Sequence, residues 1–416
     1  MTVDVRTRSD EDARALDRDE LLDGALVAAA REHGPLAARG AAYLDLPSLG
    51  LEVEGRAVTL VAGTGRLTLR EGVDRAGVVA VLDAGALSDL VQDLASTMGL
   101  AMASRATIAE GTLNHWIAWE PALRALFDGR RVHEAGDVAF ADREGGDLDL
   151  DRAFHPDEDR DEMARFLEQA GFLHLRSVFT LGEMAELGAD LDEWTARAEP
   201  DDGESWWATD AGGVQQAVRV LFFLDKSATL RALLRDRRFS WLGDLTGDGH
   251  LHSGNAEALV KPLGVVRGLS DLPWHKDCGQ GRHSYMCNSL TCGISVTGAD
   301  RHCGALGVVP GSHRANTMAA GRDPRLDLAP RLLETATGDV TVHCSDTLHR
   351  AHPPVDHPRK VVYTSFVLPP LGTADAPPRD PDGSRAARAA LSDVQARIEA
   401  ADNPASPERY RAGLGR

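Results

Sequence analysis

Apolar and polar residues alternate in short runs along residues 51–82, and glycines separate the runs. The runs are Leu51–Val53, Val58–Val61, Leu67–Leu69 and Val78–Leu82. A period of two predicts strands with one buried face, and the glycines predict tight turns. We therefore expect a meander of antiparallel strands in this part of the chain.

The pattern then changes to apolar residues three or four positions apart, first over residues 87–94 and again over residues 116–126. This spacing predicts two amphipathic helices, with Asp83 or Ser88 as the N-cap of the first. Strands followed by helices predict a small α+β domain, which we place at residues 1–140.

A new pattern begins at residue 161. It predicts a helix around Met163–Leu167, a strand at Gly171–Leu175 and a second helix from Thr180 to about Trp194. Thr180 and Glu183 have the spacing of a capping box at the start of that second helix.

Repeated β-rich runs follow, separated by Gly, Pro and Asp turns every ten to twenty residues or so. The runs are Val218–Leu224, Ala258–Val260, Leu290–Val296, Ala305–Val309, Val340–His343 and Val361–Leu368. This succession predicts a jelly roll or sandwich. We expect a mainly β, cupin-like double-stranded β-helix with flanking helices over residues 161–372.

The length of the chain supports two domains, because 416 residues exceed the size at which a single core usually stops growing. Residues 136–160 are rich in Asp, Gly and Glu, which predicts a linker, placed at 141–160. After residue 372 we expect a C-terminal tail, 373–416, with a helix near Arg385–Ala400.

Charge and composition exclude several classes of partner. The formal net charge of −19 repels phosphate backbones and anionic lipid surfaces, so we expect no nucleic acid. No apolar run is long enough to span a bilayer, and the N-terminus lacks a basic and then apolar leader, so we expect a cytoplasmic protein. Five cysteines without a C-x2-C pair favour reduced thiols over disulfides or a zinc site.

The string Pro273–Asp277 carries the candidate chemistry. His275 and Asp277 are two residues apart, so on a strand they face the same side and offer an imidazole and a carboxylate to one metal. His349 is the expected third ligand, ten residues before Arg359, and His343 is the alternative. Two histidines and one carboxylate leave positions open on Fe(II), and an arginine can bind a carboxylate through its planar fork.

From Phe166 to about Leu368 the chain resembles the phytanoyl-CoA dioxygenase family of Fe(II)- and 2-oxoglutarate-dependent oxygenases. The matching segments, in order, are Phe166–Phe172, Lys261-Pro262, Trp274-His275-Lys276-Asp277, Gly304–His313 and the stretch from Gly338-Asp339 through His349 to Arg359. Within the fourth segment, His313 is predicted to be a turn residue that satisfies backbone groups.

The resemblance implies a role for each matching residue. It implies that His275, Asp277 and His349 bind Fe(II), and that Arg359 binds the C5 carboxylate of 2-oxoglutarate. Further contacts with this cosubstrate are implied for Lys261, Asn288 and Thr291. The implied reaction uses O2 and a small-molecule substrate. The Asp277 carboxylate favours hydroxylation over halogenation, because a Gly or Ala there would open a halide site, and desaturation, epoxidation and ring closure stay open. Cys287 and Cys292 stand where bulkier residues often line the family's pocket.

The first domain resembles the sterol-carrier-protein-2 type of lipid-binding domain in its order of strands and helices. This resemblance would favour a lipid-like or CoA-linked substrate, while a natural product is equally compatible. Two other functions stay open, a non-catalytic lipid-binding protein and a cupin-like zinc hydrolase or isomerase. The zinc enzyme would need neither Arg359 nor 2-oxoglutarate. Segments 204–207 and 268–271 are expected in loops over the mouth of the barrel.

Overall fold

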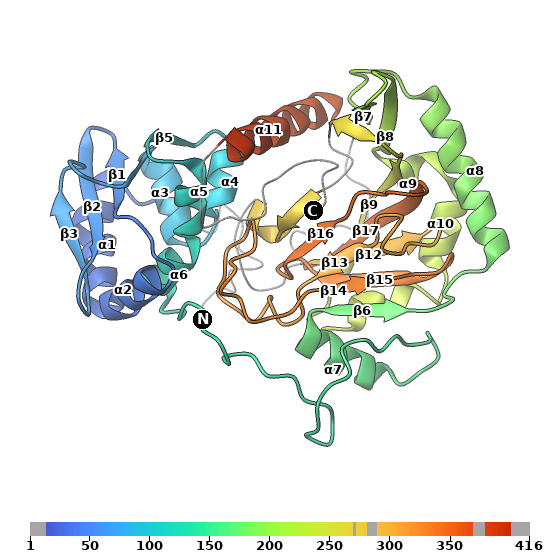
Figure 1. The fold of residues 1–416 in the computed structure, drawn as a ribbon, viewed down its shortest axis with the longest axis horizontal. Helices are drawn as coiled ribbons and strands as arrows, with labels where there is room; N and C mark the ends of the chain where they lie inside the picture. Colours follow the sequence, from blue (N-terminus) through green and yellow to red (C-terminus); the bar gives the residue numbers. More distant parts are fainter. Residues whose placement is uncertain (1–13, 269–271, 281–288, 369–378, 401–416) are drawn as a thin grey trace.

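The computed structural model describes residues 14–268, 272–280, 289–368 and 379–400, and it shows two units that lie side by side (Figure 1). The smaller unit is formed by the N-terminal part of the chain and has its own hydrophobic core. The larger unit has a second core, formed by residues 154–366. Asn288 and Cys287 fall outside the described residues.

The sheet of the first unit has five strands in the order β3-β2-β1-β4-β5. Its strands are β1 (Leu49–Val53), β2 (Arg56–Ala62), β3 (Leu67–Glu71), β4 (Val78–Leu82) and β5 (Ala106–Glu110). The predicted antiparallel meander holds for β1–β3, but it is wrong for β4, which pairs with β1 in parallel. The reason is burial: β4 is almost wholly apolar and lies inside the sheet, whereas the more polar β3 suits an edge.

Helices pack on this sheet and complete the first core. They are a π-helical turn (Glu20–Ala25), α1 (Leu26–Glu32), α2 (Gly34–Tyr43), α3 (Ala84–Val91), α4 (Thr97–Met102), α5 (Leu113–Ala118) and α6 (Glu120–Asp128). Both predicted amphipathic segments are helical. Asp83 caps α3, because its side chain accepts a hydrogen bond from the Ala86 N–H, whereas Ser88 lies within the helix. Trp116 and Trp119 are fully buried in the core.

The second unit contains two antiparallel sheets. The larger sheet has the order β10-β7-β8-β9-β17-β12-β15-β6 and the smaller β11-β16-β13-β14. The larger sheet comprises β6 (Phe172–Leu175), β7 (Ser205–Asp210), β8 (Gln215–Val220), β9 (Leu251–Lys261), β10 (Val265–Arg267), β12 (Ser289–Ser295), β15 (Val340–Cys344) and β17 (Arg359–Val367). The smaller sheet comprises β11 (Leu272–His275), β13 (Leu306–Val308), β14 (Arg331–Leu333) and β16 (His349–Ala351). Five of the six predicted β-rich runs thus coincide with β9, β12, β13, β15 and β17.

Helices flank the larger sheet of the second unit (Figure 1). They are α7 (Arg160–Ala170), α8 (Leu181–Arg197), α9 (Phe223–Lys226) and α10 (Ala228–Arg235), with 3-10 turns at Ser240–Asp244 and Cys278–Gln280. The predicted capping box of α8 is present, with reciprocal bonds between Thr180 and Glu183. Leucines of α8 and α10 enter the second core together with residues of both sheets.

Two local predictions in this unit are wrong. The run Val218–Leu224 leaves the sheet after β8, because Phe222 adopts a left-handed conformation (φ 53°) from which α9 starts. Residues 205–207 belong to β7, whose Trp206 lies opposite Arg219 of β8, rather than to a loop. A strand whose neighbours in the sequence are polar can be recognised only together with the strand that it pairs with, and that pairing cannot be predicted from the local sequence.

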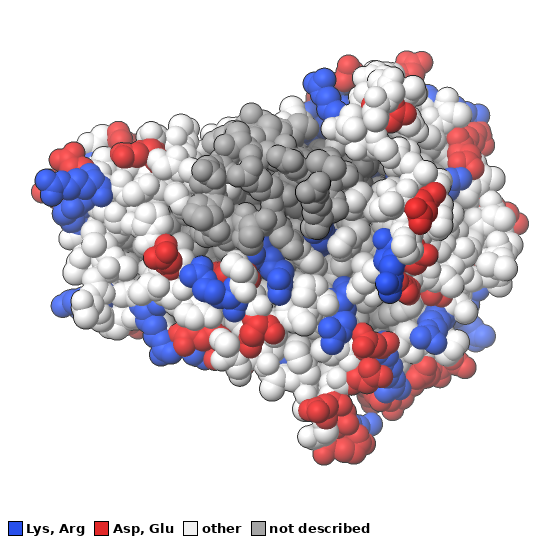
Figure 2. Space-filling view, viewed as in Figure 1, with Lys and Arg blue, Asp and Glu red and all other residues white. Residues whose placement is uncertain are grey.

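The acidic segment 136–160 packs on the second unit rather than hanging between the units. Phe154 is fully buried, its N–H donates to the His174 carbonyl, and its own carbonyl accepts from the Arg176 N–H. The side chain of Arg152 pairs with Glu158 and Glu162. Basic and acidic side chains are mixed in this way over the face of the molecule that Figure 2 shows.

The C-terminal helix α11 (Pro381–Ala400) coincides with the predicted tail helix and contacts both units. It touches α4 and α5 of the first unit, and Leu391 packs on the cluster of Trp206 in the second. The guanidinium of Arg388 donates to the Trp207 carbonyl (3.3 Å). Figure 1 shows this helix between the first unit and the β7–β8 hairpin. Among the helices that the structure describes, none is long and apolar enough to cross a membrane.

Candidate metal centre

A cavity of about 230 Å³ lies between the two sheets of the second unit. The larger sheet, the smaller sheet and α11 all contribute to its wall. Residues of the wall include Trp206, Arg219, Glu257, Thr291, His343 and Tyr363 from the larger sheet, His275, Leu306 and His349 from the smaller sheet, and Asp277 and Leu391. One polar part of this wall is the group of imidazoles around Asp277.

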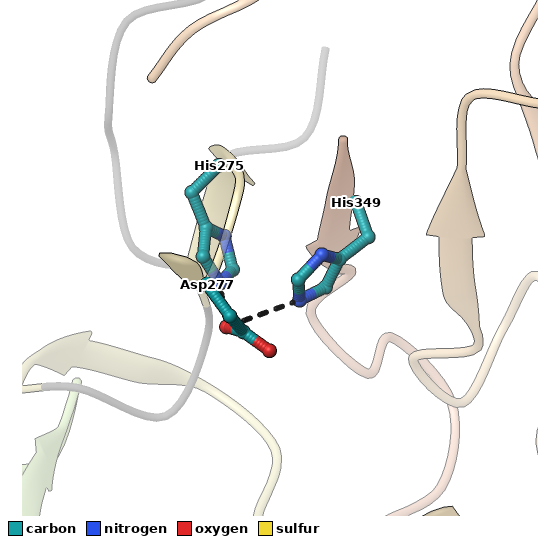
Figure 3. Close-up of side chains that lie close together, drawn as sticks. All are labelled: His275, Asp277 and His349. Atoms are coloured by element: carbon teal, nitrogen blue, oxygen red, sulfur yellow. Dashed lines mark ion pairs between the residues drawn. The ribbon is translucent and has the colours of Figure 1, made fainter. Parts of the chain in front are cut away.

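The structure brings His275, Asp277 and His349 together (Figure 3). His275 ends β11 and pairs in register with His349 at the start of the antiparallel β16, and Asp277 follows two residues after His275. Nε2 of His275 lies 3.3 Å from Oδ1 of Asp277, and Nε2 of His349 lies 3.6 Å from the same oxygen. One ligand atom from each of the three side chains lies within 4.8 Å of the others, which is compatible with a single metal ion.

Lys276, between two of these residues, holds the strand from its other side. Its buried Nζ donates to the carbonyls of Ser312 (3.0 Å) and Ala315 (3.4 Å). Burial lowers the pKa of Lys276 to about 8, so the ammonium stays mostly protonated at neutral pH. The Ser312 Oγ accepts from the Leu348 N–H (2.7 Å), directly before His349. The turn at residues 312–315 therefore positions both the segment that carries His275 and Asp277 and the strand that carries His349.

His313 in the same turn donates to the Glu168 carbonyl through Nε2 (2.8 Å), in keeping with its predicted turn role.

The hydrogen bond of His349 fixes which of its ring nitrogens carries the proton. Its Nδ1 lies 2.9 Å from the Thr347 carbonyl, which only accepts, so Nδ1 carries the proton and Nε2 presents its lone pair. Burial and the imidazoles of His275 and His343 lower the pKa of His349 well below its usual value. The neutral ring that a metal requires is thus favoured.

Asp277 is held as an ionised carboxylate with two distinct oxygens. The Thr291 hydroxyl donates to Oδ2 (3.0 Å), whereas Oδ1 faces His275 and His349. Burial raises the pKa of Asp277, but the surrounding histidines lower it more, and the pKa lies well below the usual value. About a third of the side chain (33%) stays exposed. This arrangement suits a ligand that binds a metal through one oxygen.

His343, the alternative third ligand, lies beside the group rather than in it. Its Nε2 is 3.6 Å from Oδ2 of Asp277, and its ring centroid is 4.2 Å from that of His349. Within the described residues neither of its nitrogens has a hydrogen-bond partner. The three ligand atoms that converge include His349 and leave His343 out.

The two basic residues predicted to bind the cosubstrate lie opposite each other on adjacent strands. Arg359 starts β17, Lys261 ends β9, and the two pair in register. Both are buried; Arg359 donates to the Gly304 carbonyl (2.7 Å) and Lys261 to the His352 carbonyl. Neither of the two is part of the cavity wall. Tyr363 is part of it, and the two-residue period of β17 places Arg359 on the same face of the sheet as Tyr363.

Some lining residues were not predicted. Thr291 faces the cavity, whereas Cys292 points the other way into the second core, so its predicted place in the pocket is wrong. Trp206, Arg219, Glu257 and Leu391 join the wall through long-range pairing that has no local signature. Tyr363 could have been found, since it alternates with Arg359 along one strand.

Residues 167–361 match the family model described as phytanoyl-CoA dioxygenase, and this match encloses all three converging side chains. The chain contains a domain of the phytanoyl-CoA dioxygenase family. The predicted family resemblance is therefore confirmed, and the domain is of the oxygenase type. The first unit lies outside the match, and its likeness to a sterol-carrier domain stays a prediction.

Several solved structures resemble the phytanoyl-CoA dioxygenase-type domain. AviO1 from Streptomyces viridochromogenes Tue57 is 22% identical, with 53% of this chain and 98% of that chain covered and a TM-score of 0.41. The epimerase SnoN in complex with Fe3+, alpha ketoglutarate and nogalamycin RO is 21% identical (53% and 92% covered, TM-score 0.42). EctD from S. alaskensis in its apoform is 18% identical (59% and 89%, TM-score 0.44). No curated protein matches the chain in sequence.

Proposed function

We propose that the chain is an Fe(II)- and 2-oxoglutarate-dependent dioxygenase that hydroxylates a C–H bond of a small molecule. One oxygen atom of O2 enters the substrate as a hydroxyl group, and the other enters succinate as 2-oxoglutarate loses CO2. The observation that carries this proposal is the convergence of two imidazole nitrogens and one carboxylate oxygen on a cavity within a domain of this family.

The donor set fits iron. Two neutral imidazoles and one carboxylate on one side of a metal leave its other positions for a 2-oxo acid and O2. Bound Fe(II) would supply the activation of O2 that the protein's own side chains cannot provide. His275, Asp277 and His349 would hold the ion, and Asp277 occupies the position that a halide would need. This supports hydroxylation over halogenation.

Arg359 is the proposed partner of the C5 carboxylate of 2-oxoglutarate. It is buried, its Nε has no hydrogen-bond partner in the described part of the chain, and it forms no ion pair with a described carboxylate. A buried guanidinium is normally paired with an anion, so an anionic ligand would satisfy it. Lys261, opposite it, would add a second positive charge, and Asn288 and Thr291 stay proposed contacts of the cosubstrate.

We also infer the finer architecture and the setting of the reaction. The two antiparallel sheets would form the double-stranded β-helix, with domain boundaries near residues 140, 160 and 372. The proposed substrate is a small, lipid-like or natural-product molecule that diffuses into the cavity in the cytoplasm.

Arg359→Ala is expected to raise the 2-oxoglutarate concentration needed for half-maximal turnover by about 10- to 100-fold, because it removes a charge-assisted pair. The maximal rate should change little, since the guanidinium is distant from the reacting bond. Succinate formation at varied 2-oxoglutarate measures both values. Arg301→Ala, which removes an exposed guanidinium, is the matched control. An unchanged requirement in Arg359→Ala would place the carboxylate partner elsewhere.

Anaerobic titration of the metal-free protein with Fe(II) and 2-oxoglutarate tests the proposed function itself. A chelated 2-oxo acid gives Fe(II) a visible absorption band, which should saturate at one equivalent of iron and be lost in His349→Ala. Bound iron without such a band would contradict the proposal and favour the zinc or non-catalytic alternatives.

A further inference from the structure

Four residues lie side by side across the larger sheet and face the cavity. Trp206 of β7 pairs in register with Arg219 of β8, and Arg219 pairs with Leu259 of β9. Glu257, two residues before Leu259, pairs with Tyr363 of β17. Trp206, Arg219, Glu257 and Tyr363 all belong to the cavity wall. We call these four residues the polar row.

Arg219 is held in the polar row by two neighbours. Its Nη1 donates to Oε2 of Glu257 (2.8 Å), and its guanidinium carbon lies 4.4 Å from the centroid of the Trp206 ring. Only 15% of its side chain is exposed. An arginine that is stacked and paired in this way has lost its rotamer freedom before any ligand arrives, which lowers the entropic cost of binding.

One edge of this guanidinium is unused. Nη1 is bound to Glu257, but in the described part of the chain Nε and Nη2 have no hydrogen-bond partner, and Nε is buried. Buried polar atoms without a partner are uncommon, and at a cavity wall they point to a missing ligand. Nε and Nη2 donate in parallel, which is the geometry that a carboxylate accepts from an arginine.

We propose that Arg219 binds a carboxylate of the substrate through its Nε–Nη2 edge, so that the substrate is a small carboxylic acid with an apolar body. This inference rests on the proposed function, because it names the substrate of that same cavity. The rest of the wall supports it: Leu272, Leu306, Ala351 and Leu391 are apolar. They would contact the hydrocarbon part of the molecule.

The sheet also places the oxidised position relative to the carboxylate. Arg219 lies on β8, and Thr291, which contacts Asp277, lies on β12, with β9 and β17 between them. Three strand spacings correspond to about 14 Å between the two backbones. The carboxylate would thus bind at one end of the cavity and the metal would face a carbon several bonds away. Oxidation is expected near the end of the substrate's hydrocarbon chain that is distant from the carboxylate, not next to the carboxylate.

Binding of octanoate, octan-1-ol and octylamine to the full-length protein loaded with Fe(II) and 2-oxoglutarate under anaerobic conditions tests this inference. Calorimetry should give octanoate an affinity at least about tenfold higher than that of the other two probes, because only octanoate forms charge-assisted bonds with Arg219. The iron–2-oxo acid band, recorded on the same samples, reports separately whether the proposed function holds and whether each variant is folded.

Arg219→Gln should abolish the preference for octanoate. Arg219→Lys keeps the charge beside Glu257 but lacks the parallel donors, so it should lose about tenfold in octanoate affinity. The matched control is Arg152→Gln, because Arg152 also stacks on an aromatic ring and pairs with glutamates but lies outside the cavity. Its preference should equal that of the native protein.

Two results would overturn the inference while leaving the proposed function intact. The first is octanoate that binds no better than octylamine, or equally well in Arg219→Gln, with the band still present. The second is Arg219→Gln with weakened 2-oxoglutarate binding and unchanged octanoate binding, which would make Arg219 the partner of the cosubstrate. A native protein without the band would instead contradict the proposed function.

Discussion

His275→Ala and Asp277→Ala are each expected to abolish iron-dependent turnover and to raise the Kd for Fe(II) more than about 100-fold. Even the outer partners of metal ligands contribute about 10- to 100-fold to affinity, so the loss of a ligand itself should exceed that range. The fold should be kept, because Asp277 faces the cavity and alanine leaves no unpaired charge behind. Equilibrium dialysis with Fe(II) and succinate formation measure the two effects.

His302→Ala and Asp356→Ala are the matched controls for this pair. His302 and Asp356 also form an imidazole–carboxylate contact (3.2 Å), but both are exposed and neither belongs to the cavity wall. Both controls should retain native iron affinity and turnover. Full activity in either His275→Ala or Asp277→Ala would disprove the assignment of the ligands.

Arg124→Met is expected to destabilise the first unit by about 3–5 kcal/mol, the usual cost of removing one partner from a buried ion pair, here the pair with Glu120. Arg124 is fully buried at 3.1 Å from an oxygen of Asp93 and 3.3 Å from one of Glu120, both also buried. Burial raises the pKa of Asp93 to about 8 although Arg124 lowers it. The folded state therefore retains a proton that the unfolded state releases, and stability falls as the pH rises from about 4 to 8.

Hydrogen exchange measured by mass spectrometry can locate this loss. Amides of α3, α4 and α6 should exchange more than about 100-fold faster in Arg124→Met, while those of β12 and β17 should be unaffected. The effect should be larger at pH 8, where Asp93 begins to ionise beside Arg124 in the native protein, than at pH 5, where Asp93 is protonated in both proteins. Arg105→Met, which breaks a partly exposed pair with Asp89 in the same unit, should cost less than about 1 kcal/mol. Equal losses in both variants would refute the proposed role of burial.

The approach of His275 and Asp277 could be predicted from the sequence because it is local, and their role as metal ligands stays a prediction. His275 ends β11 and Asp277 lies in the turn that follows, so the two are close because they are only two residues apart, and the spacing from His349 to Arg359 favoured His349 over His343 as the predicted third ligand. The caps at Asp83 and Thr180 were readable for the same reason, since a cap involves residues only three positions apart. These local features need no knowledge of how distant segments pack, whereas the approach of His349 to His275 depends on the pairing of β16 with β11.

The pairing of segments that are far apart in the sequence could not be predicted from the sequence. The parallel contact of β4 with β1, the β7 strand at Trp206 and the position of Leu391 beside the cavity all join residues far apart in the sequence. The acidic segment around Phe154 has the composition of a linker, yet one buried ring and two backbone hydrogen bonds fix it to β6. Composition measures the average of a segment, whereas a single apolar side chain can decide where it packs.

The two sheets that enclose the cavity divide its wall into parts that can change separately. His275 and His349 come from the smaller sheet, whereas Trp206, Arg219 and Glu257 come from β7, β8 and β9 of the larger sheet. Substitutions on these three strands can therefore alter which molecules are accepted without displacing the side chains around Asp277. Directed evolution of the substrate range of the proposed oxygenase should begin there.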